Sequence, residues 1–217
     1  MPAQLPLPIE TRHSFAREDF IAGPGNSAAI GLIDSWPAWT APAAALYGPA
    51  GSGKSHLASV WAARAGAQIV DAAALDETAL AQPTALAVEN VDHAPLTASA
   101  EAALFALLER GKALLLTGRE PPSAWPAHLP DLLSRFRALL AFPLWAPDDA
   151  LLEALARKLF ADRQLTVPDP VVAQMIHALE RSPAAVRDFV ARADRTALAQ
   201  KRPITPSLIR ELLANGA

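Results

Sequence analysis

The sequence predicts an α/β protein in which a parallel sheet is followed by a smaller, all-helical domain. Short apolar segments alternate with helical segments over the first two thirds of the chain. A glycine-rich loop with the pattern Gly-x-x-x-x-Gly-Lys-Ser joins one of these apolar segments to a helix at residues 48–55. After residue 145 the strand signals stop and amphipathic helical segments follow. This order of elements is typical of a nucleotide-binding sheet that carries a separate helical domain.

Five apolar segments are expected to form the strands, with one helical segment before the first strand and three between strands. The expected strands are residues 43–47, 68–71, 85–88, 113–117 and 138–142. The expected helices are residues 27–36, 54–65, 99–110 and 131–136. Because strands and helices alternate, a parallel five-stranded sheet with helices on both faces is favoured.

Four further amphipathic helices are expected at residues 148–163, 169–180, 183–200 and 206–214, with proline-containing breaks between them. Ser182 followed by Pro183 is typical of a helix start, with a capping side chain and proline at the first helical position. The predicted organisation is an extended tail (1–12), an α/β nucleotide-binding domain (13–146) and a helical lid domain (147–217).

Composition limits the classes of function. The 217 residues carry a net charge of −3, which provides no overall basic field for binding DNA. The absence of cysteine excludes disulfides and cysteine-based zinc sites and fits a reducing compartment. The N-terminus lacks the pattern of a secretory signal, and no segment approaches the roughly 18 apolar residues of a membrane span. A cytoplasmic protein without a membrane association is therefore predicted.

The glycine-rich loop predicts a phosphate-binding P-loop. Its backbone N–H groups and the following helix N-terminus suit a bound phosphate, the Lys54 amine would reach the β- and γ-phosphates, and the Ser55 hydroxyl would ligate Mg²⁺. A plain glycine turn is the alternative, which the agreement of all fixed positions disfavours. The residues expected to bind ADP or ATP here are Gly48, Pro49, Ala50, Gly51, Ser52, Gly53, Lys54, Ser55 and His56.

A second motif follows the apolar segment 85–88, where Glu89 and Asn90 come at the tip of the expected strand. A carboxylate at this place can hold the magnesium water shell, so Glu89 is a candidate metal residue. The alternative is an ordinary strand-to-loop junction with an acidic residue. Asn90 cannot serve as a general base, so we expect little hydrolysis of the protein's own nucleotide.

Four segments of the chain resemble the DnaA replication-initiator family of AAA+ ATPases, and the resemblance covers nearly the whole chain. The segments are 20–26 (Phe-Ile-Ala-Gly-Pro-Gly-Asn), 46–57 (the P-loop with its His-Leu extension), 115–122 (Leu-Leu-Thr-Gly-Arg-Glu-Pro-Pro) and 129–136 (Leu-Pro-Asp-Leu-Leu-Ser-Arg-Phe). The resemblance implies that Phe20, Ile21 and Asn26 belong to an adenine pocket. It also implies that Arg135 is an arginine finger.

An arginine finger acts in trans. It enters a neighbour's site and neutralises the charge that develops on the transferred phosphoryl group. Arg135 therefore implies catalysis on another protein's nucleotide. The alternative is a solvated or salt-bridged surface arginine.

The chain departs from the family at three places. Asn90 stands where the family has an aspartate, and Arg119 replaces the aspartate of the sensor strand, which leaves Thr117 as the polar group facing the phosphate. In the family, an arginine of the lid contacts the nucleotide, and the present sequence can be aligned with that segment in two ways. One alignment places Arg187 at this position, and the other places Ala184 there, with Arg181 nearby.

The N-terminal residues Gln4, Leu5, Pro6, Leu7 and Pro8 resemble the peptide by which bacterial proteins dock on the DNA polymerase sliding clamp. Prolines limit the entropy lost on binding, and the two leucines supply apolar anchors. A proline-rich leader without a partner is the alternative. The sequence ends at Ala217, before the family's DNA-binding domain, so sequence-specific DNA binding is not expected.

Together these features resemble the Hda family of clamp-dependent regulators. The resemblance implies a negative regulator of replication initiation that binds the sliding clamp and stimulates ATP hydrolysis by the initiator DnaA, while self-association stays open. A helicase-loader-type ATPase is the alternative, but it would favour an acidic pair at 89–90 and a basic path for single-stranded DNA. A stand-alone ATPase is disfavoured by Asn90.

Overall fold

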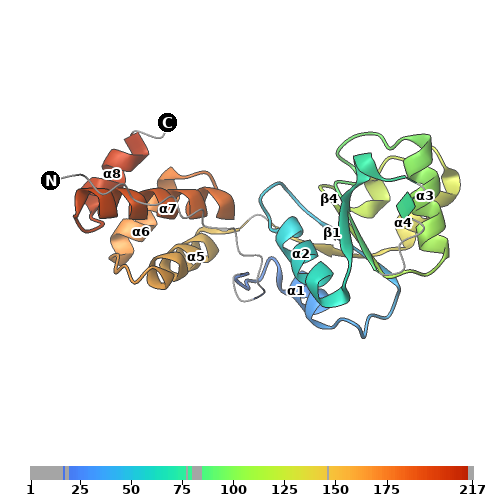
Figure 1. The fold of residues 1–217 in the computed structure, drawn as a ribbon, viewed down its shortest axis with the longest axis horizontal. Coiled ribbons are helices and arrows are strands. Elements are labelled where there is room, and N and C mark those ends of the chain that lie inside the picture. Colours follow the sequence, from blue (N-terminus) through green and yellow to red (C-terminus); the bar gives the residue numbers. More distant parts are fainter. Residues whose placement is uncertain (1–16, 18–19, 77, 80–84, 146, 215–217) are drawn as a thin grey trace. The chain divides into compact units, whose positions relative to one another are not determined.

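The computed structural model describes residues 17, 20–76, 78–79, 85–145 and 147–214 (Figure 1). The chain divides into two compact units at Pro147. The first contains the P-loop and the second is helical. The predicted clamp-binding residues 4–8 lie outside the described residues.

The first unit is built on a five-stranded sheet in the described part of the chain. The strands are β1 (Ala43–Tyr47), β2 (Gln68–Asp71), β3 (Leu86–Glu89), β4 (Leu114–Gly118) and β5 (Leu140–Pro143). Every strand pair is parallel, and the order across the sheet is β2-β3-β4-β1-β5. The predicted parallel α/β fold is therefore confirmed. Since β1 lies between β4 and β5, the P-loop leaves an interior strand of the sheet.

Helices cover both faces of this sheet (Figure 1). They are α1 (Ser27–Asp34), α2 (Lys54–Ala65), α3 (Ala98–Glu109) and α4 (Pro130–Ala138). Successive strand residues alternate between two cores, so Ala44 and Leu46 pack with α1 and α2, whereas Ala43 and Ala45 pack with α3 and α4. This alternation explains why the interior strands are apolar at consecutive positions.

The boundaries differ from the expected ones by at most two residues. The strand expected at 138–142 begins only at Leu140, because α4 continues to Ala138. The helix expected to reach residue 36 ends at Asp34, because Pro37 disfavours a helical conformation at the residue before it. Two short 3-10 turns that the sequence did not predict lie at Ala72–Ala74 and Pro122–Ala124.

The second unit has the four predicted helices among its described residues: α5 (Asp149–Asp162), α6 (Asp169–Ala178), α7 (Pro183–Gln200) and α8 (Pro206–Ala214). The Asp148 carboxylate accepts a hydrogen bond from the Leu151 N–H, and the Ser182 hydroxyl accepts one from the Ala185 N–H. Both side chains therefore cap helix N-termini, as the sequence predicts for Ser182.

Among the described helices, none combines the length and the apolar character needed to cross a membrane.

Candidate functional site

The P-loop connects β1 to α2 through three glycines with positive φ angles. These are Gly48 (φ 149°), Gly51 (φ 75°) and Gly53 (φ 100°), and Gly53 is the N-cap of α2. A glycine N-cap has no side chain that could occupy the first N–H groups of the helix. Those N–H groups and the helix dipole are consequently available to an anion.

Gly48 is the glycine with the least space, and its replacement gives a direct test of the loop. A Cβ at Gly48 would lie 1.9 Å from the Leu144 carbonyl oxygen, which is backbone and cannot rotate away. We expect Gly48→Ala to destabilise the protein by about 3 kcal/mol, through this overlap and the unfavourable φ. Urea unfolding of the purified variants measures the effect. Gly31→Ala is the control, because no atom lies within 4 Å of its added Cβ and alanine favours the α1 helix.

Lys54 folds back over the loop that precedes it. Its Nζ donates hydrogen bonds to the Gly48 carbonyl (2.6 Å) and the Pro49 carbonyl (2.8 Å). Burial lowers the pKa of the Lys54 amine below its ordinary value, and the nearby Asp92 carboxylate opposes this shift. The Lys54 amine therefore lies against the backbone of the predicted phosphate-binding loop.

Two buried polar atoms beside the loop have no hydrogen-bond partner among the described residues. They are the Ser52 Oγ and the Glu89 Oε1. A buried carboxylate oxygen without a donor is costly unless a ligand satisfies it. Glu89 and the exposed Ser55 hydroxyl therefore fit the predicted magnesium position. The described residues contain no group of three or more acidic or histidine side chains that could hold a metal, so phosphate oxygens and water would have to complete the coordination.

The side chain of Asn90 forms a hydrogen bond with β2, on the side of β3 that faces away from the P-loop strand β1. Its Nδ2 donates a hydrogen bond to the Asp71 Oδ2 at the end of β2 (2.7 Å), and its backbone N–H donates one to the Thr117 Oγ1 (3.3 Å). The sheet order places β2 on one side of β3, and β4 followed by β1 on the other. The structure thus brings the predicted residues Asn90 and Thr117 together. The Asn90 amide, however, is bonded toward β2 and not toward the loop after β1.

The hydrogen bond to Asn90 also affects Asp71. With the bond from the Ala73 N–H, it lowers the pKa of the Asp71 carboxyl below its ordinary value. Asn90 has a φ of 62°, a left-handed conformation that asparagine tolerates better than most residues. The sequence showed that position 90 is an asparagine, but it gave no sign that this side chain bonds Asp71 on β2.

Asp92 is a site residue that the sequence analysis missed. Its carboxylate accepts hydrogen bonds from the backbone N–H of Arg119 (2.8 and 2.9 Å) and of Glu120 (2.7 Å). It thereby ties the loop after β3 to the end of β4, the predicted sensor strand. The backbone of Arg119 is used here, so the change of side chain from the family's aspartate does not disturb this contact.

The predicted adenine-pocket segment contacts the end of the P-loop through the Phe20 ring. The Asn26 Oδ1 accepts a hydrogen bond from the Gly23 N–H (2.8 Å), and its Nδ2 donates one to the Ile21 carbonyl (3.0 Å). Asn26 is buried, so its amide shapes the turn that carries Ile21. The Phe20 ring makes an edge contact with the His56 ring at 5.2 Å between centroids, and a Cβ at Gly53 would lie 2.5 Å from it.

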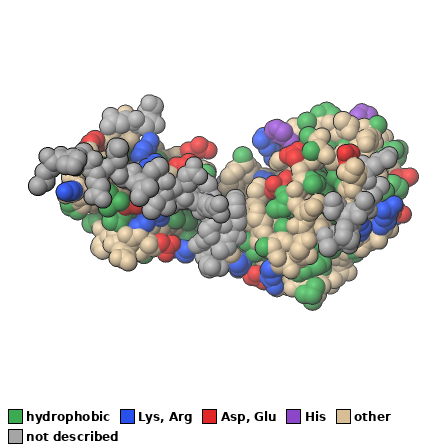
Figure 2. Space-filling view, viewed as in Figure 1, with side chains coloured by type: hydrophobic (Ala, Val, Ile, Leu, Met, Phe, Trp, Pro, Cys, Tyr) green, Lys and Arg blue, Asp and Glu red, His purple; other side chains and the backbone are tan. Residues whose placement is uncertain are grey.

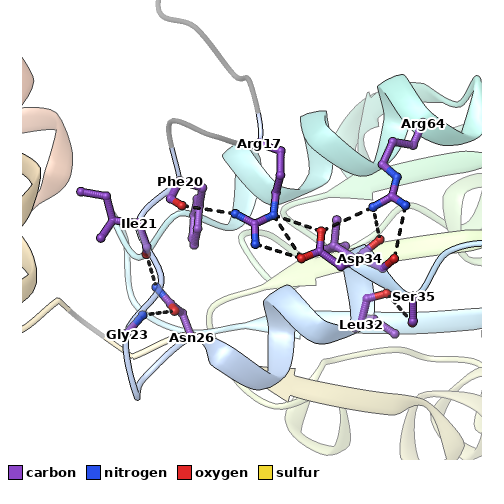
Figure 3. Close-up of polar contacts among 10 residues, drawn as sticks. Arg17, Phe20, Ile21, Gly23, Asn26, Leu32, Asp34, Ser35 and Arg64 are labelled. Carbon is purple, nitrogen blue, oxygen red and sulfur yellow. Dashed lines mark hydrogen bonds and ion pairs between the residues drawn. The ribbon is translucent and has the colours of Figure 1, made fainter. Parts of the chain in front are cut away.

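An ion-pair network that the sequence did not indicate holds the start of this segment (Figure 3). The Arg17 guanidinium donates to the Asp34 carboxylate at the end of α1 (2.9 Å) and to the Phe20 carbonyl (3.3 Å). Arg64 of α2 pairs with the same carboxylate. The hydrogen bond from Arg17 lowers the pKa of Asp34 below its ordinary value. Arg17 thus joins the Phe20 backbone, where the predicted base pocket begins, to the end of α1, and Arg64 shares the same carboxylate.

Trp145 is a further residue beside this segment. Its backbone N–H donates to the Gly25 carbonyl (3.1 Å), and a Cβ at Gly25 would lie 3.2 Å from the Trp145 Cβ. The Trp145 residue is 61% exposed. No sequence pattern marked it, because the contact joins residues that are far apart in the chain.

Arg135 lies on α4, whose buried residues belong to the core on the sheet face opposite that of α2. Its side chain is 52% exposed and forms an ion pair with Glu109 at the end of α3. Basic and acidic side chains are interspersed on the visible surface of this unit (Figure 2). Arg135 is thus a surface arginine on α4, whereas the P-loop leads into α2.

The two candidate lid arginines lie in the helical unit. The Arg181 guanidinium pairs with the Asp149 carboxylate at 3.0 Å, and its side chain is 67% exposed. Arg187 is half-buried on α7. Both candidate arginines from the two alignments therefore lie in the helical unit.

Neither a protein-family model nor a curated protein matches the sequence. Solved structures do match. Domain III of the Thermotoga maritima replication initiation protein DnaA has a TM-score of 0.75 at 18% identity, covering 94% of this chain and 97% of that one. A DnaA bound to AMPPCP and single-stranded DNA has a TM-score of 0.70 at 15% identity, covering 86% and 68%.

A mutant of Thermotoga maritima RuvB has a TM-score of 0.74 at 14% identity, covering 93% of this chain and 72% of that one. The chain has the AAA+ fold. The expected AAA+ architecture with a five-stranded parallel sheet is therefore confirmed, and the structure adds that the P-loop follows an interior strand of this sheet. At identities of 14–18% these comparisons show the fold of the chain.

Proposed function

We propose that this protein is an Hda-type negative regulator of DNA replication initiation. In this role it holds ADP or ATP with Mg²⁺ at the P-loop, docks on the sliding clamp through residues 4–8, and stimulates ATP hydrolysis by DnaA with Arg135. Three features of the chain together carry the proposal. The chain has the P-loop residues that suit a nucleotide. Asn90, bonded to Asp71, stands where hydrolysis of the protein's own nucleotide would need a carboxylate. Arg135 is exposed on a separate helix.

Nucleotide binding is supported by the P-loop and by the polar atoms around it. Lys54 and the N-terminus of α2 suit the phosphates, Ser55 and Glu89 suit Mg²⁺, and the turn shaped by Asn26 suits the base. A solved structure of the similar DnaA contains AMPPCP, an ATP analogue. A bound nucleotide would also satisfy the unpaired Ser52 hydroxyl.

Action in trans is supported by the contrast between Asn90 and Arg135. An asparagine cannot accept a proton from water, and the Asn90 amide is already bonded to Asp71. Arg135 carries a permanent positive charge on an exposed surface. A guanidinium that enters a neighbouring ATP site accelerates hydrolysis by about 10³–10⁵-fold in enzymes that use one.

A reconstitution tests the proposed function directly. Hydrolysis of radiolabelled ATP by the initiator would be measured alone, with this protein, and with this protein plus sliding clamp loaded on DNA. We expect strong stimulation only when clamp and nucleotide are both present. Initiator hydrolysis that is unchanged in the complete mixture would overturn the proposal.

Clamp docking has its own test in the N-terminal residues. We expect the double change Gln4→Ala with Leu5→Ala to abolish association with the clamp, because it removes the amide and one apolar anchor of the docking peptide. Surface plasmon resonance on immobilised clamp measures the association. Gln68→Ala, an exposed position on edge strand β2, is the matched control and should bind as the unchanged protein does. Equal binding by the double variant would show that these residues have no role in docking.

A motor or loader ATPase is the second candidate, because RuvB structures resemble this chain as well as DnaA structures do. Such a protein must turn over its own ATP. Sustained hydrolysis by the isolated protein, stimulated by DNA, would favour this candidate over the regulator.

A further inference from the structure

Glu101 is a buried charged residue that the proposed function does not use. It lies on α3 with 2% of its surface exposed. Its Oε1 accepts a hydrogen bond from the His128 backbone N–H (2.8 Å) and lies 3.0 Å from the His128 Nδ1. Its Oε2 accepts one from the Leu129 N–H (2.9 Å). The carboxylate of one helix therefore binds the start of the next helix, α4.

The bonding of Glu101 indicates a strong anchor. Burial alone would raise the pKa of this carboxyl, but the hydrogen bonds from His128 and Leu129 outweigh it and hold the pKa below its ordinary value. The carboxylate is therefore ionised at neutral pH, and its bonds are charge-assisted. The His128 side chain is 84% exposed, whereas the Glu101 side chain that bonds the two backbone N–H groups is only 2% exposed, so the buried part of the anchor is the carboxylate.

The anchored segment is the base of the helix that carries Arg135. Leu129 is the N-cap residue of α4, and its apolar side chain cannot cap the helix itself. The buried Leu132 and Phe136 fix the rotation of α4 against the core, which leaves Arg135 on the outer face. At 1.5 Å per residue, Arg135 lies about 9 Å along the helix from the anchor.

The same helix, α3, contacts α4 a second time. Glu109, in the last turn of α3, forms the ion pair with the Arg135 guanidinium. This pair is exposed on both sides, so it contributes little to stability and can exchange for another anion. The contact at Glu101 is different, because this carboxylate is buried and accepts hydrogen bonds from two backbone N–H groups at the start of α4, and loss of the acceptor would break both bonds. The position of α4 is thus set at Glu101, and the side chain of Arg135 remains free to reorient.

We propose that Glu101 is a positioning residue, which fixes the start of α4 and thereby sets where Arg135 meets a partner's nucleotide. This inference rests on the proposed role of Arg135 as an arginine finger. A charge that stabilises a transition state has to be held in place, and a misplacement of about 1 Å can cost about 10²-fold in rate. Glu101 acts through His128 and Leu129 and touches no nucleotide itself.

The test uses the full-length Glu101→Gln variant, whose side chain has nearly the same shape but only one acceptor oxygen. Hydrogen–deuterium exchange of the isolated protein should show faster exchange at His128 and Leu129, by about 10-fold or more, the factor for one charge-assisted hydrogen bond. Exchange in α1 and α2 should not change. In the reconstitution, the maximal stimulated rate should fall about 10- to 100-fold. The protein concentration at half-maximal stimulation should stay within about twofold, since the finger acts in the transition state.

Thr97→Ala is the matched control. The Thr97 hydroxyl caps α3 at the Ala100 N–H (3.1 Å), so this change loosens the helix that carries Glu101 without touching α4. We expect it to keep the full stimulated rate. Equal losses in both variants, or full stimulation by Glu101→Gln, would overturn the positioning role. If Arg135→Ala itself stimulates normally, the proposed function fails and this inference fails with it, whereas an inactive Arg135→Ala beside a fully active Glu101→Gln refutes the inference alone.

Discussion

An Arg135→Ala variant is expected to lose about 10³-fold or more of the stimulated hydrolysis of initiator ATP. The reason is that a guanidinium inserted into a neighbour's site neutralises charge that develops only in the transition state, an effect of about 10³–10⁵-fold where it has been measured. Hydrolysis in the mixture of initiator, clamp on DNA and variant gives the rate. Nucleotide binding by the variant should be normal, because Arg135 lies on α4 and the P-loop leads into α2.

The control for this prediction lies on the same helix. Arg137 is an exposed arginine two residues further along α4, and Arg137→Ala removes the same charge from another face of the same helix. Because a finger acts at one position, we expect this variant to retain most of the stimulation. If both variants lose activity in equal measure and increasing salt abolishes the difference from the unchanged protein, Arg135 contributes only to a basic docking surface. Undiminished stimulation by Arg135→Ala would remove it from the reaction altogether.

The sequence predicted the fold well because its signals are local. An apolar strand, a glycine-rich loop and a helix in succession predict a P-loop at residues 48–55 without knowledge of the rest of the chain. The same holds for the cap at Ser182, which acts on an N–H group three residues away. The boundary at residues 138–140 was wrong, because it depends on how far α4 extends before the chain enters β5.

The site was predicted only in part, for a reason that is also physical. The P-loop residues, Glu89 and Asn90 lie in recognisable patterns, but their partners come from other strands. The contact of Asn90 with Asp71 joins β3 to β2, and the contact of Asp92 with Arg119 joins the loop after β3 to the end of β4. Such pairs depend on the order of strands in the sheet. The alternation of strands and helices predicts that the sheet is parallel but does not give this order.

Glu101 is a further residue whose contacts could not be predicted from the local sequence. On its own helix it is an acid in the first turn of α3, where a carboxylate commonly stabilises the helix dipole. Its burial and its contacts with the start of α4 follow only from the packing of α3 beside α4. A sequence pattern therefore assigns Glu101 to the surface, and the tertiary structure assigns it to the core.

A Lys54→Ala variant is expected to bind ATP and ADP about 10²-fold more weakly than the unchanged protein. The change removes the amine that we propose to bond the phosphates, and each such charged hydrogen bond is worth about 1.5–3 kcal/mol. It also removes the bonds from Nζ to the Gly48 and Pro49 carbonyls that hold the loop. Isothermal titration calorimetry measures the affinity.

Thermal unfolding provides a second measurement of the same variant. Nucleotide at about 100 times its Kd stabilises a protein by about 2.7 kcal/mol, which corresponds to about 5–10 °C in Tm for a chain of this size. We expect this shift in the unchanged protein and in the control variant Lys158→Ala, which removes an amine that pairs with Asp162 in the helical unit. Lys54→Ala should show almost none of it. If the unchanged protein melts at one temperature with and without nucleotide, the P-loop does not bind a ligand, and a loop shape kept only as a turn between β1 and α2 becomes the better explanation.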